Sequence, residues 1–318
     1  MKKRQSSMQP VVWAASMAAF FAMLTGCGQT TPNTDQTTGV DESTSRTVQH
    51  SFGETTIPSD PQRVAILDGD RTLEAVVALG VDPIAAVKPP LTGDYSPAVR
   101  EELNTEPTDI GTAGAGVNLE ALLAAEPDLI IMRTTVENSR EVYEQVQSIA
   151  PTVVVEYTDA GWKDTLHQVA GFLNESDLAD SLIDGYDAEA ARVRETLDTD
   201  GVTMTVARVR TDSVRYMTQN GSFPYSVLVD LGYRAPAQQD LGSPEVTTVD
   251  VSPELIDVLA ADHMILLTDA GADDAASALQ QNPLFANLGT DVTALPSKDY
   301  LFGSVLTAHR LIDTVSER

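Results

Sequence analysis

Residues 109–131 have the sequence DIGTAGAGVNLEALLAAEPDLII, and this stretch decides the fold class. Asn118 is a typical helix-capping residue, and the leucines that follow it lie on one face of a helix that Pro127 ends. Leu129 to Met132 then form an apolar run with the length of a buried strand. A helix that leads directly into a buried strand is typical of an α/β fold with a mainly parallel sheet.

The same alternation extends in both directions from this stretch. In the first half, the pattern predicts strands at 64–67, 83–87 and 152–156, and helices at 72–79 and 139–149. Residues 162–197 show only helical periodicity, which predicts a long, stiff connector. A second series then follows, with strands at 203–209 and 264–267 and helices at 223–231 and 253–260. The predicted fold is two Rossmann-like α/β lobes joined by a long rigid interlobe helix.

The N-terminus has the features of a secretion signal. Lys2, Lys3 and Arg4 precede an apolar stretch at 11–24, which is shorter than the roughly 20 residues of a membrane-spanning helix. This length disfavours the alternative of an uncleaved transmembrane anchor. The stretch ends at Cys27, the only cysteine, which therefore has no disulfide partner and no second thiol for a metal. Its position resembles the bacterial lipoprotein pattern, so we expect an extracytoplasmic protein that is lipid-anchored to the cell membrane.

Composition sets the expected domain boundaries. Residues 28–46 are polar, and behind a lipid anchor they are predicted to form a flexible tether rather than a disordered tail without a role. The globular remainder is long enough for two domains. The predicted division is a signal peptide at 1–26, a lipid-anchored linker at 27–46, an N-terminal lobe at 47–160, an interlobe helical segment at 161–198 and a C-terminal lobe at 199–318.

The charge of the chain excludes one class of partner. The formal net charge is −27, and removal of Lys2, Lys3 and Arg4 takes it to −30, so nucleic acid is not an expected partner. The acidic excess by itself indicates only a soluble surface. After Cys27 there are three lysines and fourteen arginines, and arginine is suited to planar, bidentate recognition of oxyanions.

Several blocks resemble one family of binding proteins. The stretch at 109–131 has a counterpart in VDVSPELIDVLAADHMILL in the second half, which makes a weak internal repeat. Together with PQRVAILD, VARVRTDSVRYMTQNGSFPYSVLVDLGYRAP and NPLFANLGTDVTALPSKDYLFG, these blocks cover the chain from about Gly53 to Val315. In this order they resemble the periplasmic-binding family of iron-siderophore and cobalamin importers.

The resemblance implies a function and a set of partners. The chain would be the substrate-binding lipoprotein of an ABC importer, a monomer that delivers a ferric siderophore to a permease dimer with its ATPase. It would need no cofactor, because the chelator holds the iron. The alternatives are haem or cobalamin as the ligand of the same architecture and, less favoured, an α/β enzyme.

The sequence offers little support for an enzyme. Gly111, Gly114 and Gly116 fit neither the dinucleotide-binding nor the Walker spacing, so they are interpreted as turn residues. No nucleophile elbow is present, and the four histidines are scattered without ligand spacing. We therefore predict neither catalytic residues nor a metal site on the protein.

Candidate ligand contacts follow strand ends, where open α/β sheets bind their ligands. Arg133 follows an apolar strand directly, with an ordinary loop arginine as the alternative. Arg208 and Arg210 share one face near the end of the second lobe's first strand. Burying both cations without a partner would be costly, so a bound anion is expected beside them. The pair also matches a recurrent Arg-x-Arg of the siderophore branch.

Four further residues are weaker candidates. Tyr216 has core packing as an equal alternative, and Trp162 could stack on a planar chelator or serve the core. Tyr300 matches a cleft aromatic of hydroxamate binders, and Arg71 stands at a helix N-terminus, where the dipole disfavours a cation. Hydroxamate binders carry an arginine where this chain has Ala113 and Gly114, which favours a carboxylate or catecholate chelate.

Two glutamates occupy matching places in the internal repeat. Glu120 and Glu254 each open a helix, where the helix dipole alone favours an acid. The family resemblance implies that each also contacts an arginine of one permease subunit.

Overall fold

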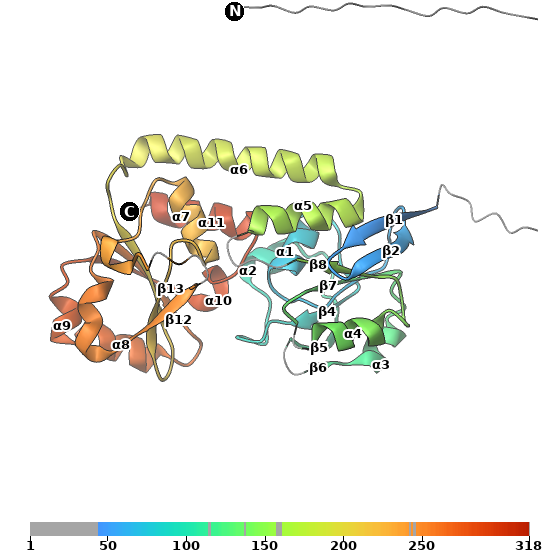
Figure 1. The fold of residues 1–318 in the computed structure, drawn as a ribbon, viewed down its shortest axis with the longest axis horizontal. Coiled ribbons are helices and arrows are strands. Elements are labelled where there is room, and N and C mark those ends of the chain that lie inside the picture. Colours follow the sequence, from blue (N-terminus) through green and yellow to red (C-terminus); the bar gives the residue numbers. More distant parts are fainter. Residues whose placement is uncertain are drawn as a thin grey trace, which may run out of the picture. The chain divides into compact units, whose positions relative to one another are not determined.

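The computed structural model describes residues 44–113, 116–136, 138–156, 161–241, 243 and 246–317. Cys27, the predicted signal peptide and most of the predicted tether lie outside these residues. Figure 1 shows two α/β lobes, each built around its own sheet, and this confirms the predicted fold class. In the described part of the chain, no helix is both long and apolar enough to span a bilayer.

The first sheet has the strand order β6-β5-β4-β3-β7-β8. All neighbours are parallel except β5 and β6, which form an antiparallel edge pair. The strands are β3 (Val64–Ile66), β4 (Ala85–Lys88), β5 (Thr108–Thr112), β6 (Gly116–Val117), β7 (Leu129–Arg133) and β8 (Thr152–Val155). Gly111 and Gly116 have positive φ, and they pair with Val117 and Thr112, respectively, so they belong to the β5–β6 strand pair rather than to a phosphate loop.

Both faces of this sheet are covered because its strands are apolar on both sides. Ile130 and Met132 face α3 (Leu119–Ala124) and α4 (Ser139–Val146), whereas Leu129 and Ile131 face α1 (Arg71–Ala78) and α5 (Trp162–Leu173). Asn118 caps α3 as predicted, because its side chain accepts a hydrogen bond from the Ala121 N–H at 3.0 Å. The short helix α2 (Pro97–Glu102) lies between β4 and β5 in the chain.

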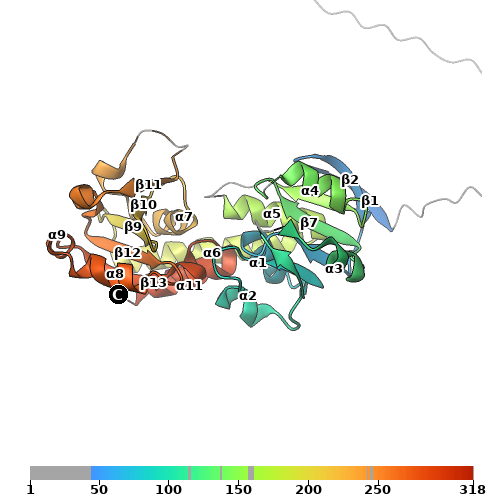
Figure 2. The same cartoon turned by 90° about the horizontal axis from the view of Figure 1, so that it is seen from below.

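The second sheet has the order β11-β10-β9-β12-β13, with β9, β12 and β13 parallel. Its strands are β9 (Met204–Val209), β10 (Val214–Met217), β11 (Thr248–Val251), β12 (His263–Thr268) and β13 (Asp291–Pro296). Its other elements are α7 (Phe223–Asp230), the 3-10 helices η1 (Ala237–Gln239) and η2 (Pro253–Leu259), α8 (Asp273–Gln281), α9 (Pro283–Ala286), α10 (Ser297–Tyr300) and α11 (Val305–Ser316). Figure 2 shows this sheet and the first one as separate units.

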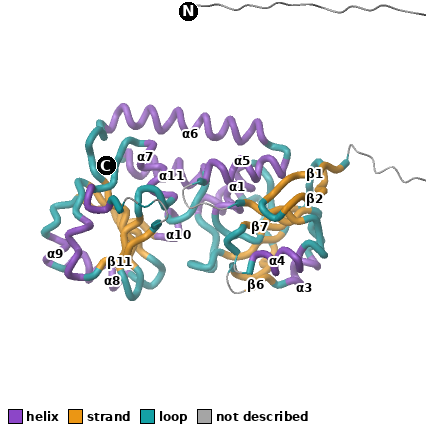
Figure 3. Tube along the Cα trace, viewed as in Figure 1, coloured by secondary structure: helices purple, strands orange, loops and turns teal. Residues whose placement is uncertain are grey.

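The connection between the lobes differs in detail from the expected single helix. Asn174 adopts a left-handed conformation after α5, which ends that helix, and α6 (Ser176–Leu197) begins two residues later. The 22 residues of α6 span ~33 Å and contact α5, α7 and α11 (Figures 1 and 3). The C-terminal helix α11 also contacts α1, α2 and α5, so a second segment ties the lobes together.

A hairpin precedes the first sheet. It consists of β1 (Ser45–His50) and β2 (Gly53–Pro58), which pair antiparallel. The Thr55 hydroxyl donates to the Thr152 carbonyl at 3.0 Å, and the Arg46 guanidinium donates to the Phe172 carbonyl at 2.7 Å. Within the described residues, the first strand therefore starts at Ser45, two residues before the predicted start of the N-terminal lobe.

One hydrophobic cluster is continuous through both lobes. It joins the α1 and α5 face of the first sheet to the α7 and α11 face of the second. Within it lies the fully buried carboxylate of Glu74, on α1. Glu74 Oε1 accepts from the Ser304 and Thr307 backbone N–H groups at 2.7 and 2.8 Å, and its Oε2 accepts from the Thr307 hydroxyl at 2.6 Å. This carboxylate therefore fastens the start of α11 to the first lobe.

We expect Glu74→Ala to lower the free energy of unfolding by about 2–6 kcal/mol, because two buried N–H groups lose their acceptor at about 1–3 kcal/mol each. Glu74→Gln keeps an acceptor oxygen and should cost about 1 kcal/mol. Urea denaturation of the two variants and the parent measures the difference. Equal stability of the alanine and glutamine variants would show that the side-chain oxygen at position 74, which accepts from Ser304 and Thr307, does not stabilise the contact between the lobes.

Candidate ligand-binding cleft

A cavity of about 150 Å³ lies between the lobes. Arg71 contributes the first-lobe wall, and the other lining residues belong to the second lobe: Arg208, Met217, Gly221, Ser222, Phe223, Thr247, Thr248, Leu301 and Phe302. A smaller pocket lies beside it, with Asp70 and the 89–96 loop on one side and Ser297, Lys298 and Phe302 on the other. Phe302 borders both spaces, so we call them together the interlobe cleft.

Arg208 and Arg210 converge on one carboxylate. Arg208 donates to Asp269 through Nε at 2.8 Å and through Nη2 at 2.7 Å, while Arg210 Nε lies 4.0 Å from the same carboxylate. Burial alone would raise the pKa of Asp269, but its hydrogen bonds with Arg208 outweigh this, so the pKa is lowered. Asp269 is thus a partner for Arg208 within the protein, so the burial of Arg208 does not by itself require a bound anion, and contact with an anionic ligand stays a prediction. Arg210, with 41% of its side chain exposed, is the more accessible of the two.

A second charged cluster lies where β3 leads into α1. The buried carboxylate of Asp68 accepts from the Thr72 N–H at 3.1 Å and lies 3.6 Å from Arg133 Nε. Burial would raise the pKa of Asp68, but Arg133 and these hydrogen bonds lower it. Arg71, in the first turn of α1, is 1% exposed and lines the cavity. Arg71 and Arg208 thus line the same cavity from different lobes, whereas Arg133 lies beside Asp68 and is not among the lining residues.

Asp70 is the titrating member of this cluster. Burial and the neighbouring Asp68 carboxylate raise the pKa of Asp70 from 3.8 to about 7, against the effects of Arg133 and Arg71. Between pH 4 and 7, Asp70 is protonated in the folded chain and ionised in the unfolded chain. The folded chain therefore binds one more proton, and the free energy of unfolding falls as the pH rises through this range.

We expect Asp70→Asn to remove this pH dependence. The stability of the parent relative to the variant should fall between pH 5 and pH 8, by at most about 1.4 kcal/mol per pH unit. Urea unfolding at the two pH values measures this change, and Asp184→Asn on the exposed side of α6 is the control. If the difference between the parent and Asp70→Asn is the same at both pH values, Asp70 is an ordinary carboxyl.

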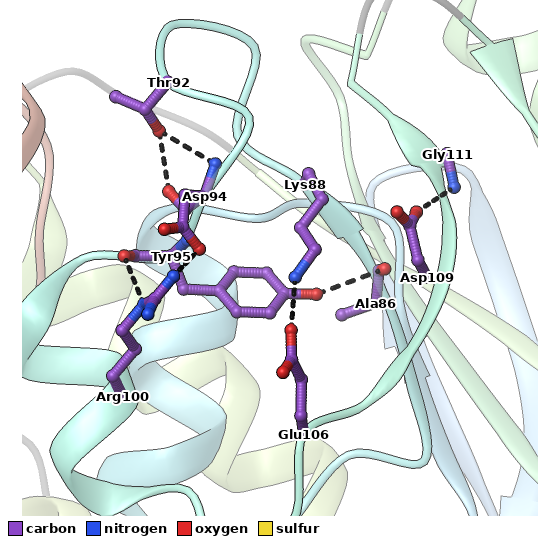
Figure 4. Close-up of polar contacts among 9 residues, drawn as sticks. All are labelled: Ala86, Lys88, Thr92, Asp94, Tyr95, Arg100, Glu106, Asp109 and Gly111. Atoms are coloured by element: carbon purple, nitrogen blue, oxygen red, sulfur yellow. Dashed lines mark hydrogen bonds and ion pairs between the residues drawn. The ribbon is translucent and has the colours of Figure 1, made fainter.

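A separate cluster supports the loop that forms one wall of the smaller pocket (Figure 4). Lys88 Nζ lies 2.8 Å from Glu106 Oε1 and 3.9 Å from the centre of the Tyr95 ring. The Tyr95 hydroxyl donates to the Ala86 carbonyl at 3.3 Å, and Arg100 pairs with Asp94. Lys88 therefore serves to hold this loop and has its charge matched within the lobe.

The three predicted aromatic contacts do not line the interlobe cleft. Tyr216 is 2% exposed and packs in the second lobe's core. Trp162 is 1% exposed, with its ring edge-on to Tyr186 at 4.9 Å between centroids, although it borders another cavity of about 450 Å³. The Tyr300 hydroxyl lies 3.1 Å from that of Thr314. In the run Tyr-Leu-Phe-Gly, the aromatic of the cleft is Phe302.

The two predicted docking glutamates are exposed and begin α3 and η2. Cys27 and Gly114 lie outside the described residues. Among the residues described, no three His, Cys, Asp or Glu side chains gather into a possible metal site. Three histidines lie beside acids instead: His167 beside Asp180, His263 beside Asp291 and His309 beside Glu189.

The fold and the cleft are those of a bilobal binding protein. Residues 64–290 match the periplasmic binding protein family, and the chain belongs to this family. It is 33% identical over 211 residues to the probable siderophore-binding lipoprotein YfiY of Bacillus subtilis strain 168, with 63% of this chain and 60% of YfiY aligned. The chain thus matches less than two thirds of the length of YfiY.

Two further similarities cover more of the chain. The Fe(3+)-citrate-binding protein YfmC of Bacillus subtilis strain 168 is 25% identical over 279 residues, which is 84% of this chain and 81% of YfmC. The crystal structure of Staphylococcus aureus SirA complexed with staphyloferrin B superposes with a TM-score of 0.70 at 26% identity, covering 86% of this chain and 97% of SirA.

Several residues of the cleft were not predicted from the sequence. Asp269 follows a predicted strand, which is the signal that also selected Arg133, and it could have been found as the partner of Arg208. Asp70 stands beside Arg71 at the start of a predicted helix, where an acid is favoured. Phe223 and Phe302 gave no such signal, because an aromatic residue in an apolar segment is more often core.

Proposed function

We propose that this chain is the extracytoplasmic substrate-binding protein of an ABC importer and that it captures a ferric siderophore. The observation that carries the proposal is the interlobe cleft, which is lined by Arg71 from the first lobe and by Arg208, Phe223 and Phe302 from the second. Cations and aromatic rings together suit an anionic chelate with planar groups. The names of YfiY, YfmC and SirA's bound ligand point to the same class of cargo.

The iron would be bound through its chelator rather than by the protein. The cavity of about 150 Å³ and the adjoining pocket of about 10 Å³ beside Lys298 are together smaller than the roughly 300–1,000 Å³ of most small-ligand pockets, so only part of a chelate would enter the cleft as it stands. Arg210, exposed beside Asp269, would provide the first contact with an anion. The arginines in the cleft disfavour haem or cobalamin as the ligand, since those alternatives fit an apolar, arginine-poor cleft.

A fluorescence titration tests this proposal. Trp162 is the one tryptophan outside the predicted signal peptide, so its emission reports ligand binding without interference from another indole. Ferric citrate, ferric staphyloferrin B, a ferric catecholate and a ferric hydroxamate should be titrated beside haem and cobalamin. We expect saturable quenching by a carboxylate or catecholate chelate. Quenching by haem or cobalamin alone would reverse the assignment.

We propose that capture involves no catalysis and that the chain acts as a monomer delivering its cargo to a permease dimer with its ATPase. The division into a tether up to residue 46 and lobes on either side of the 161–198 segment belongs to this proposal. The purified protein should leave a bound chelate chemically unchanged, which mass spectrometry of the released ligand would establish.

The membrane anchor is a separate part of the proposal. Cys27→Ser should give a protein that is unlipidated and either uncleaved or released into the medium, because no other cysteine can form the thioether. Fractionation of cells followed by mass spectrometry of the N-terminus measures the outcome. A processed Cys27→Ser protein that stays in the membrane fraction would contradict a lipid anchor.

A further inference from the structure

Asp70 faces the interlobe cleft with a side chain that its own helix does not use. It is the residue before α1, yet its carboxyl makes no hydrogen bond that caps this helix. Asp68 takes that role, because its carboxylate accepts from the Thr72 N–H at 3.1 Å and from the Asp70 N–H at 3.3 Å. The half-buried Asp70 side chain instead lines the smaller pocket of the cleft, together with Ser297 and Lys298 of the second lobe.

The charged groups around Asp70 include one acid more than bases. The cluster consists of three carboxyl groups and two guanidinium groups: Asp68, Asp70, Glu74, Arg71 and Arg133. With every group ionised, three negative and two positive charges would leave the cluster at −1. An uncompensated charge in partly buried surroundings is costly. One proton bound by the cluster would remove it.

Asp70 is the member of the cluster whose proton lies at the cleft. Arg133 and hydrogen bonds lower the pKa of Asp68, so that carboxyl stays ionised. Burial raises the pKa of Glu74, but Glu74 is bonded to the start of α11 and lines neither space of the cleft. Burial and the Asp68 carboxylate raise the pKa of Asp70 to about 7. The carboxyl that faces the cleft is therefore about half protonated at neutral pH.

Most other charged groups near the two spaces are already paired within their own lobes: Lys88 with Glu106, Asp94 with Arg100 (Figure 4), and Arg208 with Asp269. Lys298 of α10 is exposed and adds a positive charge on the second-lobe side of the smaller pocket. An anion that enters between Lys298 and Asp70 is attracted by the first and repelled by the second once Asp70 is ionised. The charge of Asp70 is thus the variable one at this end of the cleft.

We propose that an anionic ferric chelate binds together with a proton from solvent, which Asp70 takes up and uses to donate a hydrogen bond to an oxyanion of the chelate. The proposal rests on the proposed function, because it takes an anionic chelate as the ligand of the cleft. It makes Asp70 a ligand-binding residue. Since the ionised form repels the anion and the protonated form offers it a donor, affinity falls as the pH rises above neutral.

The test is isothermal titration calorimetry of the whole protein with those of the four ferric chelates that quench Trp162. Titrations at pH 7 in phosphate and in Tris, whose ionisation enthalpies differ, give the number of protons taken up. We expect the parent to take up about half a proton more than Asp70→Asn, which resembles the protonated acid in shape but cannot titrate. Asp184→Asn, on the exposed side of α6, should take up protons like the parent.

The pH dependence of affinity is the second readout. Between pH 7 and pH 8.5, the Kd of the parent divided by that of Asp70→Asn should rise at least about threefold. Because both proteins receive the same chelate, this ratio excludes the chelate's own titration. Melting temperatures at pH 7 show that the variants are folded.

The outcomes separate this inference from the function on which it rests. Proton uptake that is lost in Asp70→Asn and kept in Asp184→Asn supports the coupling. Equal proton uptake by the parent and Asp70→Asn, with a constant ratio of their Kd values, would overturn the coupling and leave siderophore capture in place. A parent protein that binds none of the four ferric chelates would overturn siderophore capture and the coupling with it.

Discussion

Replacing Arg208 and Arg210 together by alanine will weaken ferric-siderophore binding at least a hundredfold. Hydrogen bonds to a charged group contribute about 1.5–3 kcal/mol each, so the loss of two guanidinium contacts corresponds to about 3–6 kcal/mol. Arg208 lines the interlobe cleft, and Arg210 shares its carboxylate partner, Asp269. Asp269 accepts the hydrogen bonds of Arg208 when no ligand is bound, and the carboxylate groups of a chelate would accept some of them when it binds.

The control variants separate loss of ligand contacts from loss of fold. Arg208→Ala leaves the Asp269 carboxylate, 17% exposed, without its bidentate partner and should itself be destabilising. Arg208→Ala combined with Asp269→Asn removes both charges and should restore stability but not affinity. Arg192→Ala, an exposed arginine on α6, should change neither. Parent-like affinity in a folded Arg208→Ala, Arg210→Ala protein would exclude this pair from the site.

Replacing Glu120 and Glu254 together by alanine will reduce siderophore uptake by the reconstituted importer at least tenfold at saturating ligand. Both side chains are exposed in the first turn of helices that occupy equivalent places in the two lobes. Two equivalent carboxylates can engage two equivalent basic sites of a symmetric permease dimer, and such charge pairs control orientation and encounter rate. Siderophore affinity in solution should stay unchanged, because neither glutamate lines the interlobe cleft.

The matched control exchanges two exposed acids elsewhere, Glu144→Ala on α4 with Glu195→Ala on α6. It changes the net charge by the same amount and should transport like the parent. Parent-like uptake by Glu120→Ala, Glu254→Ala would return both glutamates to the ordinary role of acids at a helix start.

The sequence predicted the elements whose pattern is local. Leu129–Met132 is a buried strand because it is apolar on both faces, and Asn118 caps a helix because its side chain accepts a hydrogen bond from the backbone N–H three residues on. The break between α5 and α6 was missed because it depends on a left-handed Asn174, with no glycine or proline to mark it. In place of the helix predicted at 253–260, the structure has the kinked 3-10 helix η2 (Pro253–Leu259), with non-helical dihedral angles at Leu255.

The parts of the site that depend on tertiary contacts could not be predicted in this way. Nothing local indicates that Glu74 bonds to Ser304 and Thr307, more than two hundred residues later. The ion-pair partner of an arginine cannot be predicted from the local sequence either. Arg208 by itself suggests a bound anion, whereas the pairing of β9 with β12 is what brings Asp269 beside it. The one signal on Glu74 is an acid within an apolar helix.

The most direct test of the central claim is anomalous diffraction at the iron edge from crystals grown with the tightest-binding ferric chelate. Capture in the interlobe cleft predicts one iron peak, between the Arg71 and Arg208 walls and near Phe302, with only chelator atoms coordinating the metal. An iron peak outside this cleft, or an iron held directly by protein side chains, would contradict the account.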